Sequence, residues 1–147
     1  MESPGRGLSH IPAFSLFSAV SELFVTAGVL VIIRRNWTRR RFSLGIFLAV
    51  ALFEALVNVM YMAGRAARAS SGADPIAPGL KLFFAAHGML SLVAYLGFVI
   101  LGIFAYQDQK LGRWFFRERP ALTWTFLVLW IISVGSGEVL LALRYLT

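Results

Sequence analysis

The chain has 147 residues, of which 59% are hydrophobic and only 14% charged, and its mean hydropathy is +0.75. A soluble domain usually carries about 25% charged residues, and disorder needs low hydrophobicity with high charge, so the composition excludes both. The absence of cysteine excludes disulfides, thiol catalysis and cysteine-held metals. The net charge of +7 comes from short basic clusters between apolar runs, which is typical of membrane topology rather than of nucleic-acid binding.

Four apolar runs cover most of the chain, at about residues 11–33, 42–62, 80–106 and 121–145. Each exceeds the roughly 20 residues that a helix needs to cross about 30 Å of hydrocarbon. The first run is also longer than the roughly 7–15 residues of a signal-peptide core, so we expect a retained helix. Because little sequence remains outside these runs, residues 1–147 are predicted to form a single membrane domain. The predicted fold class is all-α integral membrane, with four transmembrane helices in an up-down-up-down bundle.

Prolines and small residues agree with this division. Pro12 and Pro120 fall at the starts of the first and last runs, where a missing N–H costs little. The connection 63–79 contains two more prolines and is predicted to be a loop. Small residues at helical spacing are expected to let the helices approach closely. The two candidate pairs are Gly45 with Ala49 and Ser133 with Gly137.

The basic residues are distributed unevenly along the chain. The first and third connections hold nine of the fourteen, and the other side of the bundle holds five. The nine are Arg34, Arg35, Arg39, Arg40, Arg41, Lys110, Arg113, Arg117 and Arg119, and the five are Arg6, Arg65, Arg68, Lys81 and Arg144. By the positive-inside rule, we expect a multi-pass protein of the cell inner (cytoplasmic) membrane with both termini on the outer side.

Two features of these connections predict how they meet the membrane. The run Arg39, Arg40 and Arg41 is expected to anchor the topology and to bind anionic lipid headgroups of the bilayer. Phe115 and Phe116, beside a tryptophan, are expected to lay the third connection on the inner membrane surface.

Each run contains one acid or histidine well inside it, namely Glu22, Glu54, His87 and Glu138 in chain order. Because a charge at this depth costs at least a few kcal/mol, such side chains normally face the bundle interior or a cavity. At about 1.5 Å per residue, the last three lie roughly 10–12 Å below the outer edge and Glu22 roughly 16 Å below it.

Two further polar residues extend this set, because each lies one helical turn from a member of it. Asn58 follows Glu54 on the same helix face, and Ser91 follows His87. The six side chains are therefore predicted to form an intramembrane polar network in the outer half of the bundle.

Three readings of this network stay open. The first is a structural network that fixes helix register. The second is a functional site, which contacts a metal or haem through His87 or relays protons through the acids. In the third, an acid faces a partner subunit. Bis-histidine haem ligation needs a second histidine, and the only other one is His10, at the outer boundary. The chain has no Gly-rich phosphate loop and no Ser/His/Asp set, so we expect no catalytic residues, no enzyme activity, no metal site and no cofactor.

Three stretches carry a resemblance to a known family. They are 124–146, the arginine-rich turn at 39–41, and 86–90 (Ala-His-Gly-Met-Leu). Together they resemble a small four-helix bacterial membrane family of unknown function that includes CtaM-type maturation factors of haem–copper oxidases. The similarity covers about residues 18–146. Family members typically carry four histidines, of which this chain keeps His87. Where family members carry the other histidines, this chain has arginines at 39–41, Tyr-Met-Ala-Gly at 61–64 and Arg-Glu-Arg-Pro at 117–120.

The resemblance implies a non-enzymatic protein that serves a respiratory membrane complex of the haem–copper oxidase type. It would be an assembly factor or a small accessory subunit, with other membrane subunits as partners and no nucleic acid. The alternative is a small proton-conducting or transport element built on the intramembrane glutamates and histidine. A third class is a haem carrier, which the single intramembrane histidine disfavours.

Overall fold

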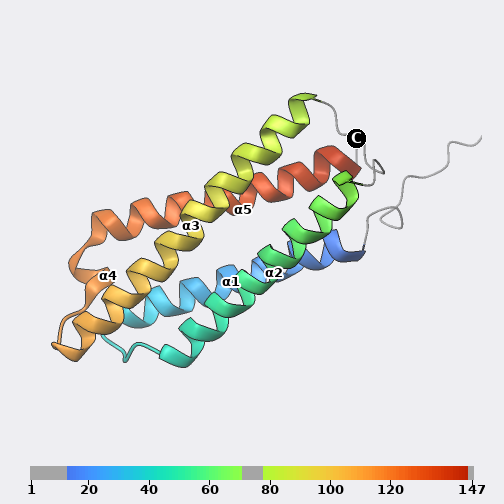
Figure 1. Cartoon of the computed structure of the whole chain (residues 1–147). Coiled ribbons are helices and arrows are strands. Elements are labelled where there is room, and N and C mark those ends of the chain that lie inside the picture. Colours follow the sequence, from blue (N-terminus) through green and yellow to red (C-terminus); the bar gives the residue numbers. More distant parts are fainter. Residues whose placement is uncertain (1–12, 71–77, 146–147) are drawn as a thin grey trace, which may run out of the picture.

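The computed structural model describes residues 13–70 and 78–145 and consists of helices joined by short connections (Figure 1). In chain order the helices are α1 (Ala13–Trp37), α2 (Leu44–Ser70), α3 (Pro78–Lys110), α4 (Phe115–Glu118) and α5 (Pro120–Tyr145). The four long helices run alternately up and down, with α1 beside α2 and α3 beside α5. The all-α four-helix bundle expected from the sequence is therefore confirmed.

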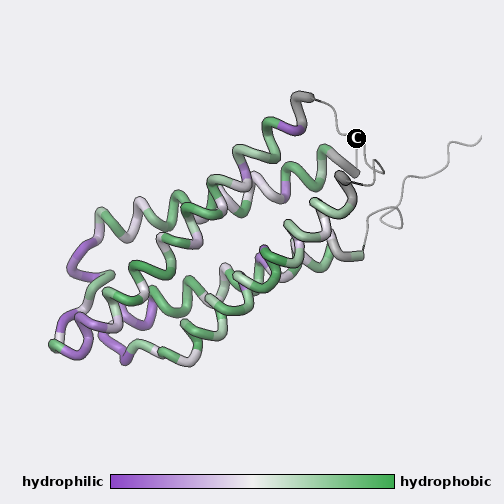
Figure 2. The backbone as a smooth tube through the Cα atoms, viewed as in Figure 1, coloured by the Kyte–Doolittle hydropathy of each residue, from purple (hydrophilic) through white to green (hydrophobic). Residues whose placement is uncertain are grey.

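Each long helix is long and apolar enough to cross a membrane, over 15–37, 44–64, 81–110 and 120–143. These spans identify a multi-pass membrane protein. Polar residues gather at the end of the bundle where α1 meets α2 and α3 meets α5, as the purple segments of Figure 2 show. This end, formed by the connections 38–43 and 111–114 together with α4, is called the basic end below.

The helices extend beyond the apolar runs at several ends. The first run ends at residue 33, but α1 continues to Trp37, and α2 continues to Ser70 through much of the predicted loop 63–79. The reason is that hydropathy measures only the part of a helix that suits lipid, whereas arginine, alanine and asparagine continue a helix into the interface at little cost. Two parts of the sequence predictions lie outside the described residues. They are residues 11 and 12, which begin the first run and include Pro12, and residues 71–77 of the predicted loop.

Helices α1 and α3 end at the basic end in the same way. Each last turn is closed by a backbone N–H that donates five residues back, from Arg40 at 2.8 Å and from Arg113 at 2.9 Å. The residue before each donor is left-handed, with φ of 56° at Arg39 and 72° at Gly112. This is the Schellman arrangement, which usually places glycine at the left-handed position. Arg39 is the exception and carries the steric cost of its Cβ.

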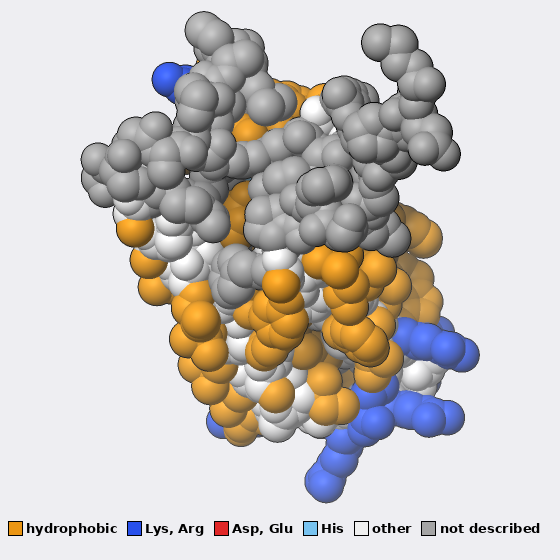
Figure 3. All heavy atoms as spheres, turned by 90° about the vertical axis from the view of Figure 1, so that its right-hand side faces the viewer, with side chains coloured by type: hydrophobic (Ala, Val, Ile, Leu, Met, Phe, Trp, Pro, Cys, Tyr) orange, Lys and Arg blue, Asp and Glu red, His pale blue; other side chains and the backbone are white. Residues whose placement is uncertain are grey.

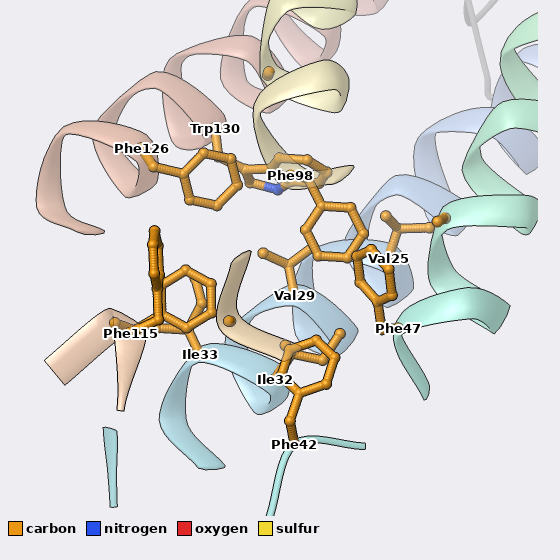
Figure 4. Packing of buried hydrophobic residues seen from close by; sticks show 14 residues of the cluster. Val25, Val29, Ile32, Ile33, Phe42, Phe47, Phe98, Phe115, Phe126 and Trp130 are labelled. Carbon is orange, nitrogen blue, oxygen red and sulfur yellow. The ribbon is translucent and has the colours of Figure 1, made fainter. Parts of the chain in front are cut away.

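An aromatic core fills the half of the bundle near the basic end (Figure 4). The α1 side of it is a stripe of residues at helical spacing that includes Val29 and Ile32, which are 0% and 1% exposed. Phe47, Phe98 and Trp130 come from the three other long helices and pack in series, with ring centroids 5.2 and 5.8 Å apart. Tightly packed rings at this level leave little room for a polar path through the bundle.

The short helix α4 folds into the basic end rather than lying on the membrane surface. Phe115 and Phe116 are only 4% and 2% exposed and belong to the core. The backbone N–H of Phe116 donates to Asn36 Oδ1 at 3.0 Å, and its carbonyl accepts from Thr123 Oγ1 at 2.8 Å. The expectation that these two phenylalanines lie on the membrane surface is therefore wrong. Their rings instead fill the space between α1, α3 and α5 at this end of the bundle.

Two close helix approaches occur at glycines that the sequence pattern did not indicate, whereas Gly137 of the second candidate pair lies against His87 of α3. A Cβ at Gly28 would lie 2.6 Å from Val50 Cγ2, and one at Gly102 would overlap the ring of Phe47. By contrast, Gly45 and Ala49 are exposed, and nothing lies within 4 Å of a Cβ built at Gly45. This pair does not bring helices of the bundle together. Hydrophobic side chains, drawn in orange, cover much of the flank that Figure 3 shows.

Candidate binding cavity

A polar cavity of about 90 Å³ lies between the four long helices, in the half of the bundle away from the basic end. All four contribute to its wall, and no lysine or arginine is among the described residues that line it. Its polar lining comprises Ser15, Ser18, Ser21 and Glu22 of α1, Glu54, Asn58 and Tyr61 of α2, and His87 and Ser91 of α3, while α5 contributes Gly137 and two leucines. Five of the six residues of the predicted network therefore line one cavity.

His87 is oriented by serines of α5. Its Nδ1 lies 2.8 Å from Ser136 Oγ, and the Ser136 hydroxyl donates to the carbonyl of Ser133 at 2.7 Å. Because that hydroxyl has a single proton, its oxygen accepts from His87 Nδ1–H. Ser91 Oγ lies 3.5 Å from Nε2 and 2.9 Å from Ser133 Oγ. The imidazole is thereby fixed in orientation with Nε2 beside Gly137.

Glu54 is held by the residue one turn further along α2. Asn58 Nδ2 donates to Glu54 Oε1 at 2.8 Å and to the Glu54 backbone carbonyl at 3.0 Å. The amide thus uses its donors within one helix turn, as the spacing of the two residues predicted. This contact stabilises the rotamer of the carboxyl group and keeps it in the cavity wall.

Glu22 lies beside His87. A Cβ built on Gly137 would be 3.3 Å from Glu22 Oε2, 3.4 Å from His87 Nε2 and 3.0 Å from His87 Cε1, so both side chains rest on the same glycine. Glu22 is also close enough to Glu54 and Glu138 for their charges to interact. The residue count placed Glu22 deeper than the other three, whereas the structure brings it beside His87 at Gly137.

Glu138 stands apart from the lining. Its Oε1 atom is buried and has no hydrogen-bond partner, although its charge reaches Glu22. From the sequence we expected at least two of Glu54, His87 and Glu138 to lie within hydrogen-bond or single-water reach, with Asn58 or Ser91 close by. The hydrogen bonds described above instead join Glu54 to Asn58 and His87 to serines of α5.

Sequence reasoning missed most of the hydroxyl groups of the site. Ser133 was considered only as a small residue and Ser136 not at all, although their spacing of three residues places them on one face of α5. The same spacing recurs in α1 at Ser15, Ser18 and Ser21, directly before Glu22. A stripe of serines ending in an acid was thus the available signal.

The cavity ends at the aromatic core. A void of about 10 Å³, room for about one water molecule, continues from Glu22 and Glu54 to Tyr95 and Trp130. There Trp130 Nε1 donates to Thr26 Oγ1 at 3.0 Å, and the core follows directly. The polar volume is therefore confined to one half of the bundle.

Neither a metal cluster nor a basic residue adds to this site within the described residues. They contain no group of three or more histidine and acidic side chains placed to hold a metal ion. Arg39, Arg40 and Arg41 are exposed at the basic end, away from the cavity. Nearby, Asp108 forms ion pairs with Arg119 at 2.7 Å and Arg113 at 3.3 Å.

The fold and the site together define a multi-pass α-helical membrane protein with a polar cavity between its four long helices. No protein-family model matches the chain, and neither does any curated protein or solved structure.

Proposed function

We propose that the chain is a non-enzymatic subunit or assembly factor of a larger membrane complex. The observation that carries this proposal is the face of α2 that contains Gly45 and Ala49. These small residues follow the spacing of membrane helix contacts, yet both are exposed and no other part of the described chain packs on Gly45. A pair of small residues exposed on the flank of α2 leaves room for the backbone of a partner's transmembrane helix to approach closely.

The particular complex that we propose is a respiratory complex of the haem–copper oxidase type in the inner membrane, with both termini outside. The support for it is the resemblance of 39–41, 86–90 and 124–146 to the family that includes oxidase maturation factors, together with the nine basic residues of the two connections.

Co-purification from native membranes tests both statements. The tagged wild-type chain is expected to retain the membrane subunits of an oxidase, identified by mass spectrometry and by haem absorption. The double variant Gly45→Leu/Ala49→Leu should lose them, because leucine holds the partner backbone away. Gly135→Leu is the matched control, since Gly135 is equally exposed on α5. Recovery of the same subunits with the double variant, or of none with the wild type, contradicts the proposal.

A second candidate is the small proton-conducting or transport element. The cavity favours it by gathering two acids and His87 from three helices in one polar volume. The aromatic core around Trp130 and Phe98 opposes a path across the whole bundle. Proton flux into liposomes that falls in Glu54→Gln, but not in Glu118→Gln at the basic end, would favour this candidate over the first.

A further inference from the structure

We infer that the cavity between α1, α2, α3 and α5 binds a primary ammonium group. The chemistry is shared by a free small amine and by the ethanolamine headgroup of a phospholipid, and the experiment below separates these two sources. This inference goes beyond the proposed function and does not depend on which complex the chain joins.

The first argument is the balance of hydrogen-bond donors and acceptors. The wall presents the carboxyl oxygens of Glu22 and Glu54, together with serine and tyrosine hydroxyl groups that accept as well as donate. The amide donors of Asn58 are already used on Glu54. An ammonium group has three N–H donors and no acceptor, so it matches a wall in which acceptors are in surplus.

The second argument is charge. Glu22 is within electrostatic reach of Glu54 and Glu138, and the described residues that line the cavity include no lysine or arginine. Like charges held together in a poorly solvated site repel, and a cation placed between them removes that repulsion.

The third argument is size. A water molecule needs about 10–15 Å³ measured in this way, so the 90 Å³ of the cavity holds several non-hydrogen atoms. That room suits an amine of the size of ethanolamine. A bare metal ion would need three or more protein ligands in one place, and the described residues contain no such group of histidine and acidic side chains.

The test uses the full chain in nanodiscs of phosphatidylglycerol, which carries no amine. Binding is measured calorimetrically with ethanolamine and with ethylene glycol, its neutral analogue of the same size. We expect binding of ethanolamine only. Loss of one charge-assisted hydrogen bond in Glu22→Gln or Glu54→Gln should weaken it about tenfold or more, whereas Glu118→Gln at the basic end should not.

Two glycine variants test the shape of the cavity without changing any charge. Gly137→Ala puts a methyl group 3.0 Å from His87 Cε1 and 3.3 Å from Glu22 Oε2, so it should narrow the cavity and weaken binding. Gly135→Ala makes the same change two residues away, where nothing lies within 4 Å, and should bind as the wild type does.

A second arm identifies the source of the ammonium. In nanodiscs containing phosphatidylethanolamine, native mass spectrometry that finds one such lipid retained by the wild type, and lost in Gly137→Ala, assigns the site to a headgroup. Binding of free ethanolamine that is unchanged by that lipid assigns it to a soluble amine. Equal binding of ethylene glycol, binding unchanged in both glutamine variants, or no binding in either arm overturns the inference.

The affinity should also depend on pH. The titratable groups around the cavity are Glu22, Glu54, Tyr61, His87 and, behind the wall, Glu138. Protons on the carboxyl groups or on the imidazole compete with the cation, so binding should tighten as pH rises from about 5 to about 8 and should release protons. Affinity that is constant or falls over this range contradicts the inference.

Discussion

The carboxyl group of Glu22 and the imidazole of His87 lie on the same glycine: a methyl group on Gly137 would be 3.3 Å from Glu22 Oε2 and 3.0 Å from His87 Cε1. This contact joins three helices, since Glu22 belongs to α1, His87 to α3 and Gly137 to α5. Because these distances are shorter than ordinary van der Waals contacts, a larger residue would push one of the two side chains aside. Glycine at this position therefore helps an acid and a histidine to share a cavity.

Replacing Glu54 separates the effect of its acceptor oxygen from that of its charge. Glu54→Gln keeps an oxygen that accepts from Asn58 and should change stability little. Glu54→Leu removes that acceptor and leaves the amide short of a partner, at a cost of about 1–3 kcal/mol. Thermal unfolding in detergent measures the difference. Equal stability of the two Glu54 variants would show that the Asn58 contact contributes nothing.

Gly102→Ala should destabilise the bundle, because its Cβ would overlap the buried ring of Phe47. Overpacking of this kind typically costs about 1–3 kcal/mol. Gly88→Ala is the control, since Gly88 is exposed and has nothing within 4 Å, and it should be neutral or stabilising by up to about 1 kcal/mol. The double variant Gly102→Ala/Phe47→Leu should recover part of the loss. Absence of any difference between the two glycine variants would contradict the close packing.

The two residues with positive φ, at the ends of α1 and α3, predict opposite effects of substitution on the stability of the bundle. Gly112→Ala should destabilise by about 1–2 kcal/mol, because alanine carries the cost of a positive φ. Arg39→Gly removes the same kind of cost and should stabilise by up to about 1 kcal/mol. The measurement is again unfolding in detergent. A stabilising Gly112→Ala would show that α3 does not end in this conformation.

Phe116→Ala tests the burial of α4. Removing a ring that is 2% exposed leaves a cavity, and we expect a loss of about 2 kcal/mol or more. Phe24→Ala should cost less, because Phe24 is 74% exposed and its ring contacts few other side chains. Similar small losses for both variants would place Phe116 outside the core.

The orientation in the membrane is tested by a reporter fused after Thr147. The excess of basic residues in the first and third connections, nine against five, leads us to expect the C-terminus outside. A reporter that is active only in the cytoplasm should then give no signal, and one that is active only outside should give a strong one. The reverse pattern contradicts the orientation.

The polar set shows where sequence reasoning succeeds and where it stops. The cost of a charge in hydrocarbon indicated that Glu22, Glu54 and His87 face the interior, and all three line the cavity. The same argument said nothing of hydroxyl groups, which membrane helices tolerate on any face, so Ser136 was missed although it orients His87. Glu138 was correctly singled out as an intramembrane acid, but the sequence did not indicate that its buried Oε1 lacks a hydrogen-bond partner.

Composition and periodicity determined the number of long helices, their approximate bounds and their alternating directions, because lipid imposes a minimum length of apolar helix on every span. Only the tertiary structure decided which faces meet. It placed Phe116 in the core instead of at the membrane surface, and it left Gly45 outside while Gly28 and Gly102 make the close contacts. The physical reason is that lipid tails and apolar side chains are equally favourable surroundings for a hydrophobic residue. Packing shape, which hydropathy does not encode, therefore selects the interior of a membrane bundle.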